Sequence, residues 1–433
     1  MHGNDKEIDK AWELLFEQHR ILERVCADGT FRISSAQMNK IYQARLLAKF
    51  DKSVQLPKIF RDHKLSILPI TRGTYLIGHF NTHKKIEYKS IKPIQIKNAP
   101  LLETLDAQNL YSEAAALLFA YHSGIINDIM NCDKVYFTVN GRMGSDKFSF
   151  SIDNNVNPLS PIHIDVINSQ VEIDAGFESS DAFIVCEAKN QAPTEILIRQ
   201  LYYPYRLWSN KINKPVIPMF LAFSNDIFHV FVYEFTDRQN YNSIVLKDYK
   251  EYTLADEDIS LQDIIDLWRT TKVIAEPNIT FPQADSFERI LDLLSVLHEE
   301  ELTHCEVTLK YEFDPRQTDY YITACEYLGL VERNKTEKNV LEYRLTAEAK
   351  RIMSWSRKKK RLELMKKILE RPVFNRAFKF FIDNNELPDK QSIYSIMKSV
   401  DFPKKINDNT IRRRSSTVLS WLNWIIRESS VTE

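Results

Sequence analysis

The sequence of 433 residues predicts an α/β protein with a central mixed sheet, an N-terminal α+β region and C-terminal helical domains. Three observations support this fold class. Between about residues 98 and 275, helical patterns alternate with short runs of β-branched and aromatic residues. Before residue 98, helix and strand patterns are mixed as well. After a linker that contains Pro277 and Pro282, the pattern is almost entirely helical.

The first segment, residues 1–97, is expected to form the α+β region. It opens with an amphipathic helix that ends near Gly29. A second helix, capped at Ser34-Ser35, is expected to run to Leu47. The run LSILPITRGTYLIGHF then predicts two strands around a turn at Gly73.

The middle segment, residues 98–275, is expected to form the central sheet and the helices packed on it. A helix is predicted over 111–130, and a hairpin over 135–151 with its turn at Asn140-Gly141. Further strands are predicted over 170–177, 182–188, 215–223 and 227–235. A helix over about 194–208 separates the second of these strands from the third.

The third segment, residues 284–355, shows helices followed by two strands. A capping box at Asp285 and Glu288 begins one helix, and Asp314 begins another that ends near Gly329. The short runs LVER and LEYRL then predict a β-hairpin. Helices followed by a hairpin are the pattern of a winged helix-turn-helix domain.

The last segment, residues 356–433, is expected to be a basic helical domain. The net charge of the whole chain is −1, but from Lys350 to Lys379 there are twelve Lys or Arg against two Glu. The run TIRRRSSTVLSWLNWII predicts a closing helix with Thr410 as its cap and an apolar back. This asymmetry predicts a basic surface at the C-terminal end.

The five cysteines are widely spaced, without a CxxC pair or zinc spacing, and are expected to be buried thiols of a reducing compartment. The charged N-terminus lacks the core of a signal peptide. No apolar run approaches the roughly 20 residues that span a bilayer. We therefore expect a soluble, cytoplasmic protein without a membrane partner.

The run QVEIDAGFESSDAFIVCEAKNQ, residues 170–191, carries the candidate chemistry. In a strand Glu187 and Lys189 share one face, roughly 6.6–7 Å apart. Asp174 can converge on them if its strand is a neighbour. Two carboxylates suit Mg²⁺, which prefers oxygen ligands, and a lysine can position or deprotonate a water or neutralise developing charge. An exposed strand with alternating charges would give the same spacing, but the apolar run FIVC favours a site.

At this point the sequence resembles a known family. The runs EIDAGFE, IVCEAKN and RQLYYPYR resemble the core of the PD-(D/E)XK nuclease superfamily, and of type II restriction endonucleases in particular. The resemblance is strongest over residues 100–250. It implies a catalytic triad of Asp174, Glu187 and Lys189, with Ile173 in the place of the usual proline. Members often add an acidic residue on an earlier helix, and Glu113 is the candidate metal ligand here; a solvated residue at a helix end is the alternative.

The resemblance also implies cofactor and partners. The cofactor would be Mg²⁺, which Mn²⁺ can replace, and the substrate would be double-stranded DNA cut at a short specific sequence. A homodimer is expected because each site cuts one strand. A companion DNA methyltransferase and a prokaryotic cytoplasm are expected too. Glu172 and Gln200 are candidates to support the metal ligands indirectly. Gln200 and Arg206 are candidates to brace the site or contact a phosphate, although such residues are more often surface or structural ones.

Several basic or polar residues are candidates for DNA contacts, with solvated or structural surfaces as the alternative. In the N-terminal region, which looks like a recognition region beside the nuclease core, they are Arg45, Lys49 and Arg72. In the winged helix, whose recognition helix would span 316–328, they are Arg316 and Gln317. In the basic helical domain they are Lys358, Lys359, Lys360, Arg412, Arg413 and Arg414.

Two other functions fit the same patterns. One is a different nuclease on the same core, for repair, transposon ends or branched DNA. The other is a non-enzymatic DNA-binding regulator, in which the winged helix binds DNA and the α/β segment acts as a sensor.

Overall fold

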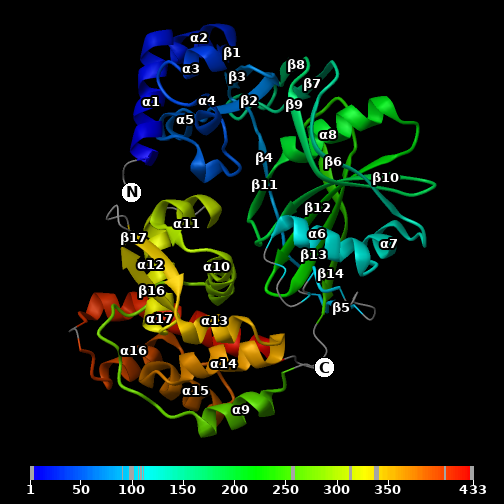
Figure 1. Cartoon of the computed structure of the whole chain (residues 1–433). Helices are drawn as coiled ribbons and strands as arrows, with labels where there is room; N and C mark the ends of the chain where they lie inside the picture. Colours follow the sequence, from blue (N-terminus) through cyan, green and yellow to red (C-terminus); the bar gives the residue numbers. More distant parts are fainter. Residues whose placement is uncertain are drawn as a thin grey trace. The chain divides into compact units, whose positions relative to one another are not determined.

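The computed structural model describes residues 4–89, 91–96, 102–105, 107, 110, 112–254, 259–311, 315–335, 341–403 and 406–429. Within these residues the chain forms two compact units (Figure 1). Unit 1 comprises Met1–Leu105 and Ser112–Thr253, and unit 2 comprises Asp106–Tyr111 and Leu254–Glu433. Among the described residues, no helix has the length and the apolar character needed to cross a bilayer.

Unit 1 begins with short helices around a small antiparallel sheet, in the strand order β1-β3-β2. The elements are α1 Asn4–His19, α2 Ile21–Asp28, β1 Thr30–Ser34, α3 Ser35–Met38, α4 Ala44–Leu47, α5 Lys58–Asp62, β2 Ser66–Thr71 and β3 Thr74–Gly78. Trp12 and Phe60 meet edge to face at 4.7 Å in its core. The predicted turn between β2 and β3 is confirmed, whereas β1 was not predicted.

The second predicted helix is shorter than expected. Ser34 does cap it, because its hydroxyl accepts a hydrogen bond from the Gln37 backbone N–H in a capping box. However, α3 ends at Met38, and a separate helix α4 begins only at Ala44, whose backbone N–H donates to Asn39 Oδ1 at 2.8 Å. The side chain of the residue that follows α3 thus satisfies the first backbone N–H of α4.

In the described part of unit 1, seven strands form a mixed sheet in the order β5-β14-β13-β12-β10-β9-β6. Their bounds are β5 Ile94–Gln95, β6 Tyr136–Gly144, β9 Gln170–Glu178, β10 Phe183–Lys189, β12 Val216–Ser224, β13 Ile227–Phe235 and β14 Ile244–Thr253. Strands β10 and β12 are parallel, as are β14 and β5, and the other pairs are antiparallel. The predicted mixed α/β architecture is confirmed.

Two smaller pairs complete the strands of unit 1. One joins β7 Phe148–Ile152 with β8 Ile162–Val166, and the other joins β4 His83–Lys85 with β11 Glu195–Leu197. The predicted hairpin over 135–151 is therefore wrong. Strand β6 continues through Asn140-Gly141 and pairs with β9, with shifts of register at this point. Gly141, at φ 93°, serves a bulge instead of a turn.

Helices cover both faces of the large sheet (Figure 1). Helix α6 Glu113–His122 packs on one face, where the rings of Phe119 and Phe228 stack 5.8 Å apart. Helix α8 Ile198–Lys211 connects β10 to β12 and packs on the other, where Trp208 meets Phe183 at 5.0 Å. Because side chains alternate along a strand, Glu187 and Lys189 share the α8 face with Phe183. The helix predicted over 111–130 is divided, since α7 Ile125–Met130 begins after Gly124 at φ 84°.

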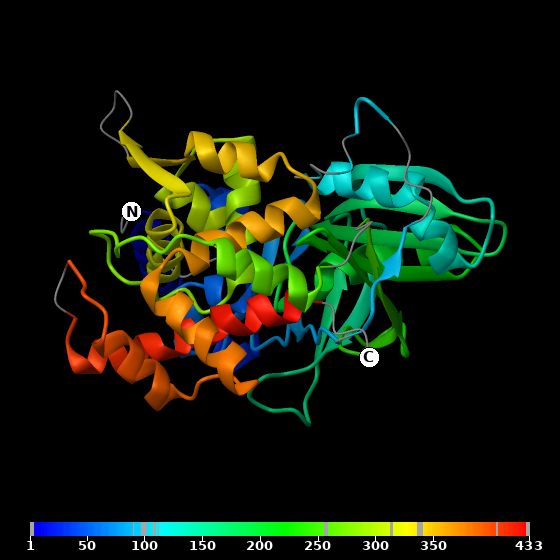
Figure 2. The ribbon, with the colours of Figure 1, turned by 90° about the horizontal axis from the view of Figure 1, so that it is seen from below.

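Unit 2 is built of helices around one core, with a small antiparallel sheet in the order β15-β17-β16. Its elements are α9 Leu261–Thr270, α10 Phe287–Glu299, β15 Leu302–Thr303, α11 His304–Tyr311, α12 Pro315–Tyr327, β16 Val331–Lys335, β17 Leu341–Leu345, α13 Ala347–Met353, α14 Arg357–Leu369, α15 Pro372–Asn384, α16 Lys390–Lys398 and α17 Asp408–Glu428. Helix α15 packs against both α14 and α17 (Figure 2). Helix α9 lies in this unit, although its residues were grouped with the middle segment on sequence.

Three predicted details of the local structure need correction. The cap of α10 is Ser286, whose hydroxyl accepts from the Arg289 backbone N–H, and not Asp285. The cap of α17 is Asn407, which places Thr410 inside the helix. All five cysteines are free thiols, but Cys26 is exposed, and only Cys186 and Cys325 are fully buried. The cap predicted at Asp314 lies outside the described residues.

Candidate active site

The candidate site lies where β9 and β10 stop pairing. The antiparallel pairing of the two strands ends at Cys186 and Ala175. The next residues along the two strands are Glu187 and Asp174. Here the Ala188 backbone N–H donates to Asp174 Oδ2 at 2.8 Å, in place of a bond between the two main chains. The two strands are therefore neighbours, which the sequence had left open as a condition, and this brings Asp174 beside Glu187.

Glu187 is the centre of the site. It is only 5% exposed, and its Oε1 accepts a hydrogen bond from Lys189 Nζ at 2.7 Å. Gln200 Nε2, in the first turn of α8, donates to the same oxygen. Strand alternation aims Glu187 and Lys189 at the α8 face, and the helix places Gln200 against them. The structure thus brings together three residues that the sequence had singled out.

Glu113 joins this group from the start of α6. The Ser112 hydroxyl caps the helix by accepting from the Ala115 backbone N–H. Glu113 Oε1 then lies 3.8 Å from Lys189 Nζ, at ion-pair distance. Its side chain is 46% exposed, so one side faces solvent while the other faces the lysine. The candidate metal ligand on the helix is therefore close to the strand residues.

The electrostatics of the site are those of charges held out of water. Burial raises the pKa of Glu187 to about 8, against the opposing effect of Lys189 and with a further rise from Asp174. Burial also raises the pKa of Glu113. For Lys189, burial opposes the charge, but Glu187 and Glu113 outweigh it and hold the pKa above its usual range. The lysine is thus stabilised as an ammonium.

The donor set fits a metal ion that takes few ligands from the protein. Among the described residues, no cluster of three or more His, Cys, Asp or Glu is arranged to hold a metal. Mg²⁺, however, commonly uses one or two carboxylates together with waters and substrate phosphate. Hydrogen bonds from the described residues reach only one oxygen of each carboxylate, Oε1 of Glu187 and Oδ2 of Asp174. The second oxygen of each remains available as a ligand.

A polar cluster that the sequence reasoning missed lies on the same face of the sheet. Lys189 pairs with Ala222 on β12, which in turn pairs with His229 on β13. The neighbour of His229 on β14 is Glu251. His229 Nδ1 lies 3.2 Å from Glu251 Oε1 and 2.9 Å from the Tyr249 hydroxyl, which itself donates to Glu251. Polar residues inside the apolar strand runs were the available signal, but only the pairing aligns them with the lysine.

The basic candidates of the N-terminal region are all exposed. Arg45 lies on α4, Lys49 follows that helix, and Arg72 lies at the turn between β2 and β3. Lys49 is the one with a link to the site, because its charge lowers the pKa of Glu113 against the larger effect of burial. These three side chains keep the exposure that a DNA contact requires.

Two candidates of unit 1 are placed away from the group. Glu172 is exposed and forms an ion pair with Arg142 on β6 at 3.0 Å. Arg206 is 7% exposed, and its Nη1 donates to Ser149 O at 2.8 Å and to the Tyr202 hydroxyl at 2.7 Å. The expected phosphate contact of Arg206 is therefore corrected, because its position on the inner side of α8 commits it to the core.

The basic run at the start of α14 is only partly exposed. Lys358 forms an ion pair with Asp263 at 3.3 Å. Lys359 is exposed, and its Nζ lies 4.0 Å from the ring centroid of Trp355. Lys360 is 5% exposed. The DNA contact expected of Lys360 is corrected, because this position of the helix faces the core.

The three consecutive arginines of α17 are likewise only partly exposed. Arg412 and Arg413 are exposed, and the guanidinium of Arg412 lies over the ring of Tyr394. Arg414 is 8% exposed, and its Nη1 donates to Gln283 Oε1. A DNA contact therefore remains a candidate role for Arg412 and Arg413. For Arg414 this expectation is corrected, because the side chain is buried.

The last two candidates lie at the start of α12. Arg316 is exposed and Gln317 is half-buried, in the first turn after Pro315. Their placement on the first turn of this helix agrees with the position expected from the sequence.

Comparison with known proteins gives three family matches. Residues 9–77 match the "Domain of unknown function (DUF6996)" and residues 78–253 the "Domain of unknown function (DUF6997)". Residues 289–430 match the "Domain of unknown function (DUF7226)". No curated protein and no solved structure matches the chain. Apart from residues 106–111, the first two matches lie in unit 1, and the third lies in unit 2. The chain is thus similar to three families whose descriptions assign no function.

Proposed function

We propose that the chain is a Mg²⁺-dependent endonuclease that hydrolyses phosphodiester bonds of double-stranded DNA at a specific sequence. The observation that carries the proposal is the convergence of Asp174, Glu187 and Lys189 where β9 and β10 part. This is the triad that the resemblance to PD-(D/E)XK nucleases and type II restriction endonucleases implies. The approach of Glu113 from an earlier helix adds to the support.

The carboxylates supply the ligands in this proposal. Asp174 and Glu187 would each offer one oxygen, and Glu113 stands within reach of the same group. Mg²⁺ or Mn²⁺, when bound there, would polarise the phosphate and acidify a bound water. Gln200 fixes the orientation of Glu187 by its hydrogen bond, which leaves the second carboxylate oxygen to face the ligand.

Lys189 would act as a cation. The sequence left open whether it positions a water, takes its proton or neutralises charge. Because Glu187 and Glu113 outweigh burial and hold its pKa above the usual range, a role as proton acceptor is disfavoured. An ammonium 2.7 Å from Glu187 is placed to stabilise the negative charge that develops on the phosphate oxygens.

Unit 2 and the N-terminal region would hold the DNA. The order α10, β15, α11, α12, β16, β17 is consistent with a winged helix, in which α12 would be the recognition helix. Exposed basic side chains occur on both parts, and phosphate contacts of this kind supply much of the affinity for DNA. A homodimer is part of the proposal because one site cuts one strand. A companion DNA methyltransferase would protect the host sequence.

The test is digestion of a sequenced phage DNA that carries no methylation. We expect discrete fragments with Mg²⁺ or Mn²⁺, none with EDTA, and none from Glu187→Gln. The matched control is Glu178→Gln, on the same sheet, where a glutamate also pairs with a lysine, Lys214, at 2.6 Å. A smear would contradict site specificity. Cleavage by Glu187→Gln at the wild-type rate would contradict the site itself.

Two alternatives are distinguished by the same experiment. A nuclease for repair, transposon ends or branched DNA would leave linear phage DNA intact but cut such substrates with the same dependence on Glu187. A non-enzymatic DNA-binding regulator is favoured by one observation, the element order of α10 to β17 in unit 2. It predicts binding to duplex DNA without cleavage of any substrate.

A further inference from the structure

A largely buried histidine of β13 lies in the same cross-strand row as Lys189. Strands β10, β12, β13 and β14 are neighbours in the large sheet (Figure 1), and their register aligns Lys189 with Ala222, His229 and Glu251. The preceding residue, Phe228, stacks on α6, so alternation turns His229 to the face of α8 and Lys189. Because adjacent strands are about 4.8 Å apart, the α-carbons of His229 and Lys189 lie roughly 10 Å apart, with the small Ala222 between them.

One ring nitrogen of His229 is committed to the interior of the sheet. Nδ1 lies 3.2 Å from Glu251 Oε1 and 2.9 Å from the Tyr249 hydroxyl. Burial and Glu251 raise the pKa of Tyr249, which therefore keeps its proton and donates it in a hydrogen bond to Glu251. Both oxygens that face Nδ1 are thus acceptors, and the network assigns a hydrogen to Nδ1. In the neutral ring Nε2 then has a free lone pair, and in the charged ring it is a donor.

The other ring nitrogen, Nε2, is left for a ligand. It forms no hydrogen bond within the described part of the chain, and it is not one of the fully buried polar atoms of that part, so it keeps accessible surface. The Tyr88 ring meets the imidazole edge to face at 5.1 Å, and the Tyr88 hydroxyl donates to Pro193 O at 3.0 Å. The imidazole is therefore held in place at Nδ1 and by a ring contact, while Nε2 can bind a ligand.

The partners of His229 are costly groups to bury. Glu251 and Tyr249 are each 7% exposed, and a carboxylate in such a place has lost most of its water. Their hydrogen bonds orient a histidine whose free nitrogen faces outward, which gives this cost a use. When the ring is charged, Glu251 is in place to pair with it from behind.

We propose that His229 is a further DNA-binding residue of the active site, and that its Nε2 donates to a phosphate next to the scissile one. The inference rests on the proposed function, because cleavage at Glu187 and Lys189 brings DNA to this face. At roughly 10 Å from Lys189, measured along the row, His229 is placed for a neighbouring phosphate of the same strand and not for the phosphate that Lys189 stabilises. A charged imidazole and a phosphate form a charge-assisted hydrogen bond.

A metal ion is the other ligand that such a nitrogen commonly takes, since a metal-binding histidine usually donates its second N–H to a carboxylate. Within the residues that the structure describes, however, no cluster of three or more His, Cys, Asp or Glu is arranged to hold a metal. The single nitrogen of His229 therefore favours a phosphate over a metal ion.

The experiment measures the affinity of the full chain for a DNA duplex of mixed sequence, by fluorescence anisotropy in EDTA. His229→Asn keeps a donor to Glu251 near the position of Nδ1 but removes Nε2, so we expect a Tm close to that of the wild type. At about pH 6, where histidine can be charged, it should bind roughly tenfold more weakly. Its slope of log affinity against log salt should fall by about 0.9, the value for one phosphate.

The difference between His229→Asn and the wild type should shrink at about pH 8, because a neutral imidazole with its hydrogen on Nδ1 has no donor for the phosphate. Burial raises the pKa of Glu187 to about 8, but this group changes its charge in both proteins alike and cancels in the comparison. Glu251→Gln keeps the shape and the acceptor of the side chain but not its charge. It should lose most of the gain in affinity at about pH 6, and it carries the test if His229→Asn unfolds.

The matched control is His163→Asn. His163 is an exposed histidine of the same unit, and its Nε2 lies 3.8 Å from Asp165. This variant should bind the duplex as the wild type does at both pH values. A loss of affinity in His163→Asn equal to that in His229→Asn would mean that any histidine of unit 1 has this effect, and would contradict the proposal.

The outcomes separate this inference from the proposed function. Equal affinity and equal salt slopes for His229→Asn and the wild type would overturn the inference and leave the nuclease intact. A loss of affinity that appears only with added Mn²⁺ or Zn²⁺ would overturn it as well, because His229 would then be a metal ligand. Affinity that depends on His229 in a protein that cleaves no DNA would support the inference and contradict the nuclease. A wild type that binds no duplex DNA would contradict both.

Discussion

Charged side chains gather at the end of β10 but spread around the axes of α14 and α17. On the strand, Glu187 and Lys189 are two residues apart and meet at 2.7 Å. On α17, successive residues differ in direction by about 100°, so three consecutive arginines cannot share one face. Two of them are exposed and Arg414 is buried. Charged residues two positions apart on a strand thus lie on the same face. Consecutive charged residues on a helix point in different directions, and some of them face the core.

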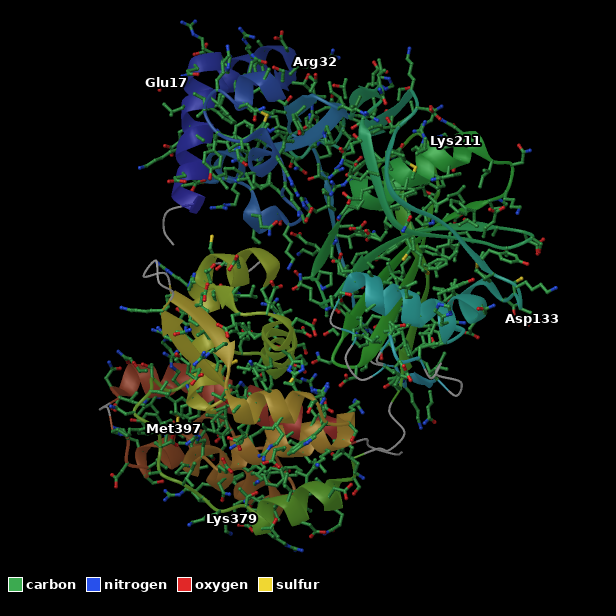
Figure 3. The ribbon with its side chains drawn as sticks, in the orientation of Figure 1. Glu17, Arg32, Asp133, Lys211, Lys379 and Met397 are labelled. Atoms are coloured by element: carbon green, nitrogen blue, oxygen red, sulfur yellow. The ribbon has the colours of Figure 1, made fainter. Side chains whose placement is uncertain are left out.

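The strand β10 and the helices of unit 2 also differ in the free-energy cost of their charged side chains. Glu187 and Lys189 are largely buried, and taking such a pair out of water can cost more than the attraction returns. Lys379, which is labelled in Figure 3, forms an ion pair with Asp383 on the same helix α15 at 2.6 Å; both side chains are exposed, and such a pair is worth about 0.3–0.5 kcal/mol. Stability alone therefore does not account for the buried pair of Glu187 and Lys189. The contrast supports a chemical role for the charges on β10.

The largest effect is expected from Lys189→Met compared with Lys214→Met. Each variant removes a lysine that binds a glutamate, at 2.7 and 2.6 Å. Loss of the Lys189 ammonium should lower the cleavage rate by about 10²–10³-fold, the usual effect of removing one donor that stabilises a transition state. Loss of Lys214 should leave the rate unchanged. Rates are measured in single turnover at saturating Mg²⁺; equal reductions in both variants would mean that Lys189 has no special part in cleavage.

A smaller loss is expected from Gln200→Leu. The amide of Gln200 holds Glu187 without being a ligand itself in the proposed site, and removal of such partners usually costs about 10–100-fold in metal affinity or activity. Because the defect lies in the orientation of Glu187, a higher Mg²⁺ concentration should restore part of the rate. Mg²⁺ titrations of the wild type and the variant measure this recovery. A loss that no Mg²⁺ concentration reduces would assign Gln200 a different part.

The same contrast explains what could be predicted from the sequence. Strand alternation placed Glu187 and Lys189 correctly, because a period of two leaves only two faces. The pairing that aligns His229 with Lys189 joins strands far apart in the sequence, and no local pattern states which strands will be neighbours. The dipeptide Asn140-Gly141 has the chemistry of a turn, yet β6 continues through it because pairing with β9 outweighs the local preference. The number of exposed side chains in the basic runs of the helices was overestimated, because consecutive residues of a helix point in different directions.

A change in stability with pH is expected for the protein without metal. Burial raises the pKa of Glu187 to about 8 from an ordinary 4.5, so the folded state keeps a proton that the unfolded state releases. The favourable contribution is fully present below pH 4.5 and is lost as the pH rises toward 8. The raised pKa of Lys189 changes the stability only above pH 10.5, outside this window.

Glu187→Gln should therefore become more stable relative to the wild type between pH 5 and 8, since it has no charge to bury. The Tm of both proteins, measured in EDTA across this range, gives the difference, with roughly 2–4 °C expected for each kcal/mol. Glu178→Gln, whose parent side chain is partly exposed, serves as the control and should run parallel to the wild type. Parallel curves for Glu187→Gln as well would mean that the Glu187 carboxylate is not held out of water.

The smallest effect concerns DNA affinity and the arginines of α17. The double variant Arg412→Gln, Arg413→Gln removes two exposed cations, whereas Arg414→Gln removes a buried one. If the exposed pair binds phosphates, the slope of log affinity against log salt should fall by about 0.9 for each phosphate that is no longer neutralised, and thus by about 2. Arg414→Gln should leave this slope unchanged even where it lowers the Tm. Fluorescence anisotropy with a duplex at several salt concentrations measures both slopes, and a lower slope in Arg414→Gln alone would show that α17 presents its inward face to DNA.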